Sequence, residues 1–305
     1  MNAQIDSIVE QACRVILGKE RQIRLALACL LARGHLLIED LPGMGKTTLA
    51  HVLANSLGLS FQRIQFTSDL LPADILGVSV YDRDGGSFKF HPGPIFAQLI
   101  LADEVNRATP KAQSALLEAM EEHQVTQEGE TRPLPEPFFV IATQNPSHQI
   151  GTFPLPESQL DRFLMRIELG YPAAAAEREL YRGEDRRDLL QSLEPVMAVK
   201  DLLAVQQRVS HVHVSDPLLD YLQALVAHTR QDPTYGNGLS PRAGLALLRA
   251  AQAWALMDDR DHVLPEDLQA VLPGVVRHRL ESFGGGPGGA LPDPAATLLE
   301  RVPIP

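Results

Sequence analysis

Several features that direct a chain to a membrane, a secretory route or a nucleic acid are scarce in this sequence. Its 305 residues contain no run of about eighteen apolar residues, so no transmembrane helix is expected. Residues 1–6 carry neither a basic segment nor an apolar one, and no secretory signal is expected. The formal net charge of −11 disfavours passive binding to DNA, RNA or anionic lipid. These absences together predict a cytoplasmic protein.

Cysteine is also scarce, since Cys13 and Cys29 are the only two in the chain. Both stand among aliphatic residues in helical patterns, and their spacing fits no metal site. We therefore expect two small buried side chains in a reducing compartment. Hydrophobic residues make up 45% of the chain, which is enough to build the core of one large or two medium domains.

The most informative segment that is present is 42–48, Pro-Gly-Met-Gly-Lys-Thr-Thr. An apolar run precedes it and a helical pattern follows it, which predicts a strand, a glycine-rich turn and a helix. Such a turn directs its N–H groups at oxyanions, and the helix N-terminus adds partial positive charge. We expect Lys46 to reach the β- and γ-phosphates of a nucleotide and the Thr47 hydroxyl to bind Mg²⁺. The predicted nucleotide-binding residues are Pro42, Gly43, Met44, Gly45, Lys46, Thr47 and Thr48.

One residue departs from the usual phosphate-loop pattern. That pattern opens with a glycine, and this chain has Asp40 there. The alternative, a glycine-rich turn without a ligand, is disfavoured by the strand before it and the helix after it.

Hydrolysis needs two further groups, a carboxylate that holds Mg²⁺ and a group that positions water. Residues 95–102 are largely apolar, as in a buried parallel strand, and Asp103 and Glu104 follow them. The carboxyl end of such a strand should emerge beside the phosphate loop. Asp103 is then expected to act through the Mg²⁺ shell, and Glu104 to polarise the attacking water. Without the phosphate loop, the same pair would be read as a solvated turn.

A third strand is predicted at 138–143, and Asn145 follows it. An amide at this strand end is expected to contact the γ-phosphate or the lytic water. Asn145-Pro146 is also a common turn opener, and both interpretations are compatible.

Five segments together resemble the MoxR family of AAA+ ATPases, from the start of the chain to residues near 280. They are Pro-Gly-Met-Gly-Lys-Thr, Leu-Ala-Asp-Glu-Val-Asn-Arg-Ala, Gln-Ser-Ala-Leu-Leu-Glu-Ala-Met-Glu-Glu, Ala-Thr-Gln-Asn-Pro and Leu-Pro-Glu-Ser-Gln-Leu-Asp-Arg-Phe. The resemblance implies an α/β fold, an AAA+ αβα P-loop NTPase core with a parallel sheet, followed by a small all-α helical lid domain. It also implies ATP and Mg²⁺ as cofactors and a homo-oligomeric hexameric ring with each ATP between two subunits.

The resemblance gives roles to individual residues. It makes Lys46 and Thr47 the first nucleotide motif, Asp103 and Glu104 the second, and Asn145 the first sensor.

Two arginines also receive roles from the resemblance. Arg162 matches the arginine finger that enters the neighbouring subunit's site, where a guanidinium stabilises the charge of the transition state. Arg166, one turn further on if the segment is helical, and Arg107 are competing candidates. The alternative for Arg162 is a surface salt bridge with Glu157 or Asp161.

Arg242 matches the second sensor, which contacts the γ-phosphate in cis. Ser240 is the predicted N-cap of its helix, and Pro241 occupies the first helical position. An arginine in a first helical turn carries an electrostatic cost that a bound phosphate would offset. The alternative is an ordinary surface arginine.

We predict three regions: a nucleotide-binding core at 1–170, a helical lid at 171–282 and a flexible Gly/Pro-rich tail at 283–305. Two hairpins, at 76–90 and around Gly129, are expected to interrupt the core and to face the pore or a client. The turn 18–20 is expected near the adenine base.

The expected function is an ATP-driven ring that remodels, assembles or activates partner proteins, and the resemblance makes a von Willebrand factor A-domain protein a frequent partner. The alternative is a DNA-directed AAA+ motor of the helix-2-insert clade, whose hairpins should be basic. Here acids accompany the bases on both hairpins, in the sets Arg83, Lys89, Asp82, Asp84 and Arg132, Glu128, Glu130. Nucleic acid is therefore not the expected substrate. A GTPase would need an Asn-Lys-x-Asp segment, which is absent.

Overall fold

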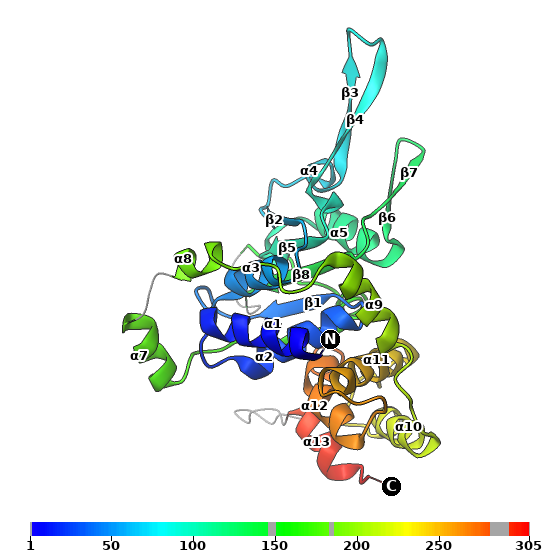
Figure 1. Ribbon diagram of the computed structural model, residues 1–305. Helices are drawn as coiled ribbons and strands as arrows, with labels where there is room; N and C mark the ends of the chain where they lie inside the picture. The colour runs from blue at the N-terminus through cyan, green and yellow to red at the C-terminus, as the bar shows by residue number, and fades with distance from the viewer. Residues whose placement is uncertain (1, 146–150, 183–185, 281–292, 305) are drawn as a thin grey trace.

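A five-stranded parallel sheet forms the centre of the protein in the computed structural model, which describes residues 2–145, 151–182, 186–280 and 293–304 (Figure 1). The strand order is β2-β5-β8-β1-β9. The bounds are β1 (Leu36–Glu39), β2 (Phe61–Gln65), β5 (Leu99–Asp103), β8 (Phe139–Gln144) and β9 (Met165–Ile167). Each neighbouring pair is parallel, and β5 lies beside β8. The predicted parallel sheet is confirmed.

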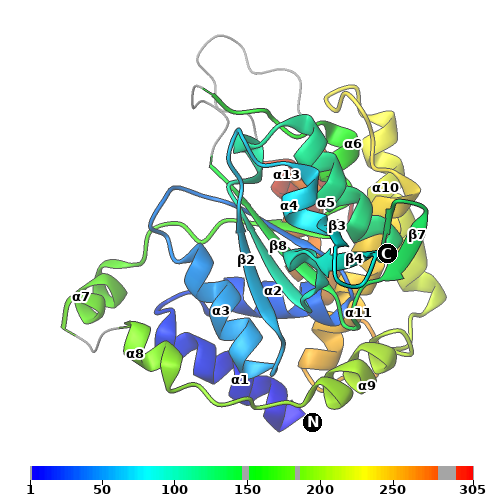
Figure 2. The ribbon, with the colours of Figure 1, turned by 90° about the horizontal axis from the view of Figure 1, so that it is seen from above.

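Helices cover both faces of the sheet because its strands are apolar on both sides (Figure 2). Leu99 and Leu101 join one core cluster, and Ile100 and Ala102 join the other. On the first face lie α1 (Asn2–Val15), α2 (Glu20–Leu31) and α3 (Lys46–Ser56), and on the second α4 (Pro72–Leu76) and α5 (Pro110–Glu122). The predicted αβα layering is confirmed.

Two antiparallel hairpins extend from the same end of the molecule, opposite the lid (Figure 1). They are β3 (Gly77–Asp82) with β4 (Ser87–Pro92), and β6 (Gln124–Gln127) with β7 (Glu130–Pro133). Gly77 is required at the base of the first, since a Cβ there would lie 2.3 Å from a carbonyl oxygen of the opposite strand. The Arg132 guanidinium lies 3.9 Å from the centre of the Phe90 ring, so the two hairpins contact each other.

The C-terminal part of the protein is helical, as predicted. Its helices are α9 (Val199–Val209), α10 (Asp216–Gln231), α11 (Pro241–Met257), α12 (Pro265–Val276) and α13 (Pro294–Arg301). Three shorter elements lie within the core, namely η1 (Pro94–Phe96), η2 (Val105–Arg107) and α6 (Glu157–Leu160), and two helices follow β9 before the C-terminal part, α7 (Ala174–Arg182) and α8 (Arg186–Gln191). Within the described ranges, no helix has the length and apolar content needed to cross a bilayer.

The structure corrects the C-terminal part of the predicted tail, whereas residues 283–292 of that prediction lie outside the described residues. Residues 294–301 form a helix, α13, that packs on α10 and α12 of the same chain. The side chains of Ala295, Leu298 and Val302 are buried there, and the Asp293 carboxylate caps the helix. Apolar spacing after a good N-cap therefore produced a docked helix where composition had suggested a flexible tail.

The predicted start of the lid at residue 171 is also too early. α8 contacts α1 and α3, which belong to the core. The helices that pack together as a lid begin at α9.

A buried arginine joins the lid to the core. The side chain of Arg279, which is 5% exposed, donates to the Asp161 carboxylate at 2.6 Å. It also donates to the backbone oxygens of Asp161, Phe163, Leu164 and Val275. One guanidinium thus satisfies acceptors on both parts of the chain.

We predict that Arg279→Ala lowers the free energy of unfolding by about 3–5 kcal/mol, because it leaves a carboxylate and several buried carbonyls without a donor. Urea denaturation measures this loss. The matched control is Arg277→Ala, which breaks a more exposed ion pair with Asp293. That change should cost at most about 1 kcal/mol. Equal effects of the two substitutions would contradict the role given to Arg279.

Candidate active site

The glycine-rich turn between β1 and α3 has the backbone that a phosphate cradle requires. Gly43 and Gly45 have φ values of 84° and 92°, in the left-handed region that glycine adopts without strain. Gly45 is the N-cap of α3, so Lys46 and Thr47 begin the helix. The N–H groups of the first helical turn have no intrahelical acceptors, and they are therefore free to bind an anion.

Lys46 is held beneath this turn by oxygen acceptors. Its ammonium donates to the backbone oxygens of Asp40 and Leu41 and, at 3.2 Å, to Oδ1 of Asn145. Burial lowers the pKa of Lys46, while nearby carboxylates oppose that shift. Asp40, the departure from the usual loop pattern, accepts hydrogen bonds from the backbone N–H groups of Leu41 and Gly170 at 2.8 and 2.6 Å. The Asp40 carboxylate therefore joins the start of the loop to the segment that follows β9.

Asp103 is the last residue of the buried strand β5 and is itself buried. Its Oδ1 accepts a hydrogen bond from the Thr143 hydroxyl at 2.5 Å, and its Oδ2 forms an ion pair with Arg63 at 2.6 Å. The same Thr143 hydroxyl accepts the N–H of Glu104 at 2.9 Å. One hydroxyl on β8 thus orients both acids of the predicted pair.

Glu104 has an unusual backbone for a residue with a side chain, with φ 57° and ψ 49°. This left-handed conformation costs about 1–3 kcal/mol and is typical of functional sites. Three polar side chains surround its carboxylate: Asn145 and Gln65 donate to it at 3.1 Å each, and Arg107 pairs with it at 3.2 Å. Asn145 therefore lies between Lys46 and Glu104, as its position at the end of β8 predicted.

These residues line one cavity of about 310 Å³. Its walls are Pro42, Gly43, Gly45, Lys46, Thr47, Thr48, Asp103, Glu104 and Asn145. The sequence therefore predicted all of the residues that surround it. Met44, also predicted, lines the adjoining cavity described next.

The donor set fits Mg²⁺. The Thr47 hydroxyl and the Asp103 carboxylate offer hard oxygen ligands, and both residues line the same cavity. The described residues contain no group of three His, Cys, Asp or Glu side chains that could hold a metal alone. This pattern suits Mg²⁺, which is usually bound by one or two protein oxygens, substrate phosphates and water.

A second, more apolar cavity of about 320 Å³ adjoins the phosphate loop and shares Gly43, Gly45 and Thr48 with the first. Val15 at the end of α1, the two residues after it, Ile16 and Leu17, and the side chains of Tyr171 and Tyr181 line it. Lys19, in the turn at 18–20, is part of the wall. Its apolar walls fit the flat base of a nucleotide whose phosphates lie on the loop.

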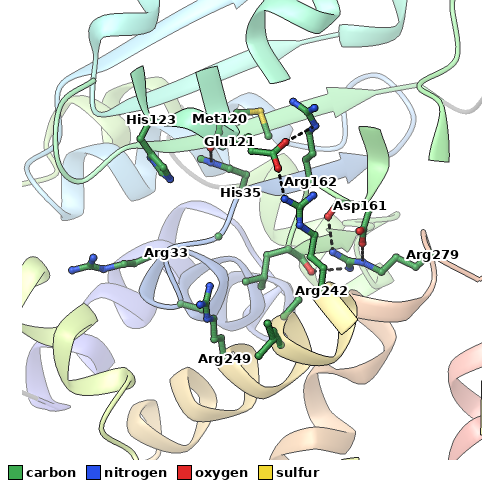
Figure 3. A pocket seen from close by; sticks show the side chains of 15 residues that line it. Arg33, His35, Met120, Glu121, His123, Asp161, Arg162, Arg242, Arg249 and Arg279 are labelled. Carbon is green, nitrogen blue, oxygen red and sulfur yellow. Dashed lines mark hydrogen bonds and ion pairs between the residues drawn. The ribbon is translucent and has the colours of Figure 1, made fainter. Parts of the chain in front are cut away.

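The two predicted arginines lie together, in a third cavity of about 390 Å³ (Figure 3). Arg162 Nε pairs with Glu121 at 3.1 Å, and Arg242 Nη2 pairs with the other oxygen of the same carboxylate. Ser240 is the N-cap of α11, as predicted, and its hydroxyl accepts the Ala243 N–H.

The expected contact of Arg242 with its own phosphate cavity is wrong for this structure. Arg242 points to Glu121 at the end of α5 and lines a cavity that shares no residue with the phosphate loop. The reason is the position of the lid, in which α11 packs against α2 and α12.

The competing arginines occupy other positions. Arg166 lies in strand β9, where it pairs with Glu39 at 3.0 Å, and the alternative of a helix there is wrong. Arg107 pairs with Glu104 of its own chain. Of the three candidates, Arg162 is the one that shares a carboxylate with Arg242.

The arginine cavity is strongly positive although the chain is acidic. Arg33, Arg162, Arg242, Arg249 and Arg279 line it with two carboxylates, Glu121 and Asp161, an excess of three positive charges. Among the described residues, Arg33 and Arg249 have no ion-pair partner, and Figure 3 shows them apart from Glu121. Such a surface favours a polyanion.

Several residues of the site were missed by sequence reasoning. Arg63, Gln65 and Thr143 contact the acids from the neighbouring strands β2 and β8. A polar residue at the C-terminal end of an otherwise apolar strand is the signal that could have identified Thr143. Glu121 belongs to the segment Gln-Ser-Ala-Leu-Leu-Glu-Ala-Met-Glu-Glu, but nothing in that segment indicates its arginine partners.

Comparisons with known proteins agree with this geometry. Residues 35–165 match the model of the ATPase family associated with various cellular activities (AAA), and residues 227–295 match the AAA lid domain. A Cytophaga hutchinsonii protein of known crystal structure superposes with a TM-score of 0.90 at 37% identity, covering 100% of this chain and 96% of that one.

Curated relatives are similar over most of the chain. The uncharacterized protein YeaC of Bacillus subtilis is 48% identical, over 89% of this chain and 85% of its own length. Chaperone MoxR1 of Mycobacterium tuberculosis is 41% identical, over 90% of this chain and 75% of its own length. This chain therefore belongs to the MoxR family of AAA+ ATPases, binds nucleotide and hydrolyses ATP.

Proposed function

We propose that the protein works as a homo-oligomeric hexameric ring that hydrolyses ATP between subunits to remodel, assemble or activate a client protein. One observation carries the proposal. The described residues that line the phosphate cavity include no arginine, whereas Arg162 and Arg242 lie together in a separate cavity. A phosphate that needs a guanidinium would therefore receive it from an adjoining subunit.

The residues of the phosphate cavity divide the chemistry among them. Lys46 and the loop N–H groups would bind the β- and γ-phosphates. Thr47 and Asp103 would hold Mg²⁺, partly through water, and the bound ion would supply positive charge at the phosphate oxygens. Glu104 would accept a proton from the attacking water, and Asn145 would orient that water or the γ-phosphate.

Arg162 is the proposed arginine finger, which would contact the γ-phosphate bound by the neighbouring subunit. Arginine fingers contribute roughly 10³–10⁵ to phosphoryl-transfer rates by stabilising charge on the transferred group. Because Arg242 shares Glu121 with Arg162, we propose that it also acts on the neighbour's phosphate rather than on its own.

The two hairpins are the proposed client contacts. Val78, Val80, Tyr81 and Phe88 on the β3–β4 hairpin have large exposed side chains, which suits an unfolded or apolar polypeptide. The only arginine of the β6–β7 hairpin stacks on Phe90 and pairs with Glu130, so it offers little free charge to DNA. These contacts favour a protein client over a DNA-directed motor.

The partner and location follow the family resemblance and the chemistry of the chain. We propose a client that contains a von Willebrand factor A domain, on the resemblance alone. Cys13 and Cys29 are both free thiols, which suits the reducing cytoplasm.

We predict that Glu104→Gln binds ATP as the wild type does but reduces kcat by at least about a hundredfold, since the amide cannot accept the proton from water. Radioactive phosphate release measures turnover, and equilibrium binding of a fluorescent ATP analogue measures affinity. Near wild-type hydrolysis by this variant would contradict the role of Glu104.

Two inactive variants should partly rescue each other when mixed. Lys46→Ala removes the phosphate contact of a subunit's own site, and Arg162→Ala removes the guanidinium offered to its neighbour. In mixed rings some interfaces contain one intact set, so ATPase activity should reach a measurable fraction of wild type at intermediate ratios. Native mass spectrometry establishes that mixed rings form. Mixed rings without any recovery would refute a finger that acts between subunits.

The Arg63–Asp103 ion pair should compete with Mg²⁺. Arg63 is 48% exposed, so its pair is worth at most about 1 kcal/mol. We predict that Arg63→Gln lowers the Mg²⁺ concentration for half-maximal ATPase activity about two- to fivefold. Titration of activity with Mg²⁺ at saturating ATP measures this. A higher Mg²⁺ requirement would show that Arg63 supports the site instead.

A further inference from the structure

Among the described residues, Glu121 is the one carboxylate that contacts both Arg162 and Arg242 in the arginine cavity (Figure 3). It belongs to the motif Ala-Leu-Leu-Glu-Ala-Met-Glu-Glu, near the C-terminal end of α5. The nucleotide chemistry described above gives this residue no part, because it lies outside the phosphate cavity.

The two guanidiniums need a shared anion to lie side by side. Like charges at contact distance repel, and each long side chain loses rotamer freedom when it is fixed. The hydrogen bond from Arg242 and the charges of both arginines lower the pKa of Glu121, so its carboxylate is ionised at neutral pH. Arg162 receives a second anchor, because its Nη1 donates to the Leu117 backbone oxygen at 2.7 Å.

The contacts with Glu121 leave donors free for a further anion. Arg162 uses Nε and Nη1, and among the described residues its Nη2 has no acceptor. Arg242 uses Nη2, and its Nη1 and Nε have none in the same part of the chain. A guanidinium has five N–H donors in a rigid plane, so the carboxylate can hold one edge while a phosphate takes another. Glu121 therefore orients the arginines without blocking them.

We propose that Glu121 is a positioning residue that holds Arg162 and Arg242 as a pair, ready for the γ-phosphate bound by the neighbouring subunit. The inference rests on the proposed ring. Glu121 would contact no nucleotide, yet it would influence the rate of ATP hydrolysis at the adjoining site.

The test uses full-length subunits mixed into wild-type rings. The added subunits are in large excess, so nearly every wild-type site adjoins one of them. Each added subunit carries Glu104→Gln, which silences its own site, so turnover comes from the wild-type sites. Three second substitutions are compared with Glu104→Gln alone: Glu121→Gln, Arg162→Ala and Glu122→Gln. Glu122 is the matched control, because it is exposed, adjacent and of equal charge, and the described residues give it no ion-pair partner.

We expect the Glu121→Gln subunits to lower kcat per wild-type site about tenfold further than Glu104→Gln alone, because a finger misplaced by an ångström loses up to about a hundredfold. KM for ATP should stay within about twofold, since the phosphate cavity is unchanged. Glu122→Gln subunits should match Glu104→Gln alone. Native mass spectrometry sets equal incorporation of each variant.

The outcomes separate the two proposals. If Arg162→Ala subunits cause no further loss, the composite site between subunits is wrong. If they do, but Glu121→Gln matches Glu122→Gln, the positioning role of Glu121 is overturned and the ring proposal stands. A rise in turnover with Glu121→Gln would also overturn it, because the carboxylate would then be a competitor of the phosphate.

Discussion

Parallel pairing of β5 with β8, and of β8 with β1, is the constraint on which the nucleotide site depends. Parallel strands end at one edge of a sheet, so the phosphate loop, the acids and Asn145 emerge together. The register Ala102 against Ala142 also places the Thr143 hydroxyl between Asp103 and the N–H of Glu104. A slip of one residue would turn that hydroxyl to the other face and release both acids.

The position of the lid determines which groups Arg162 and Arg242 can contact. Arg279 donates to the carboxylate of Asp161, the residue before Arg162. It also donates to the Val275 backbone oxygen in α12, which belongs to the lid. One buried cation therefore fixes the lid and the segment that carries Arg162. As a result Arg242 comes to lie beside Arg162 on a shared carboxylate, away from the loop that binds the subunit's own phosphates.

Local patterns predicted the parallel sheet, both hairpins and every wall of the phosphate cavity, because loop, acids and Asn145 each follow their own strand. They failed where long-range packing decides. No pattern near Arg242 shows that α11 faces Glu121, and none near Arg63 shows that β2 lies beside β5. The helix α13 was missed because glycine-rich composition before it outweighed the apolar spacing of Leu298 and Val302.

α5 runs from the turn that follows Glu104 to Glu121, a rod of 13 residues and about 20 Å. At its start, the Gln113 side chain binds the Val105 and Ala108 backbone oxygens, which ties the rod to the catalytic turn. At its end sits the anchor of the two guanidiniums. In the proposed ring, α5 would therefore connect the nucleotide site of each subunit to the two arginines that the same subunit offers to the next.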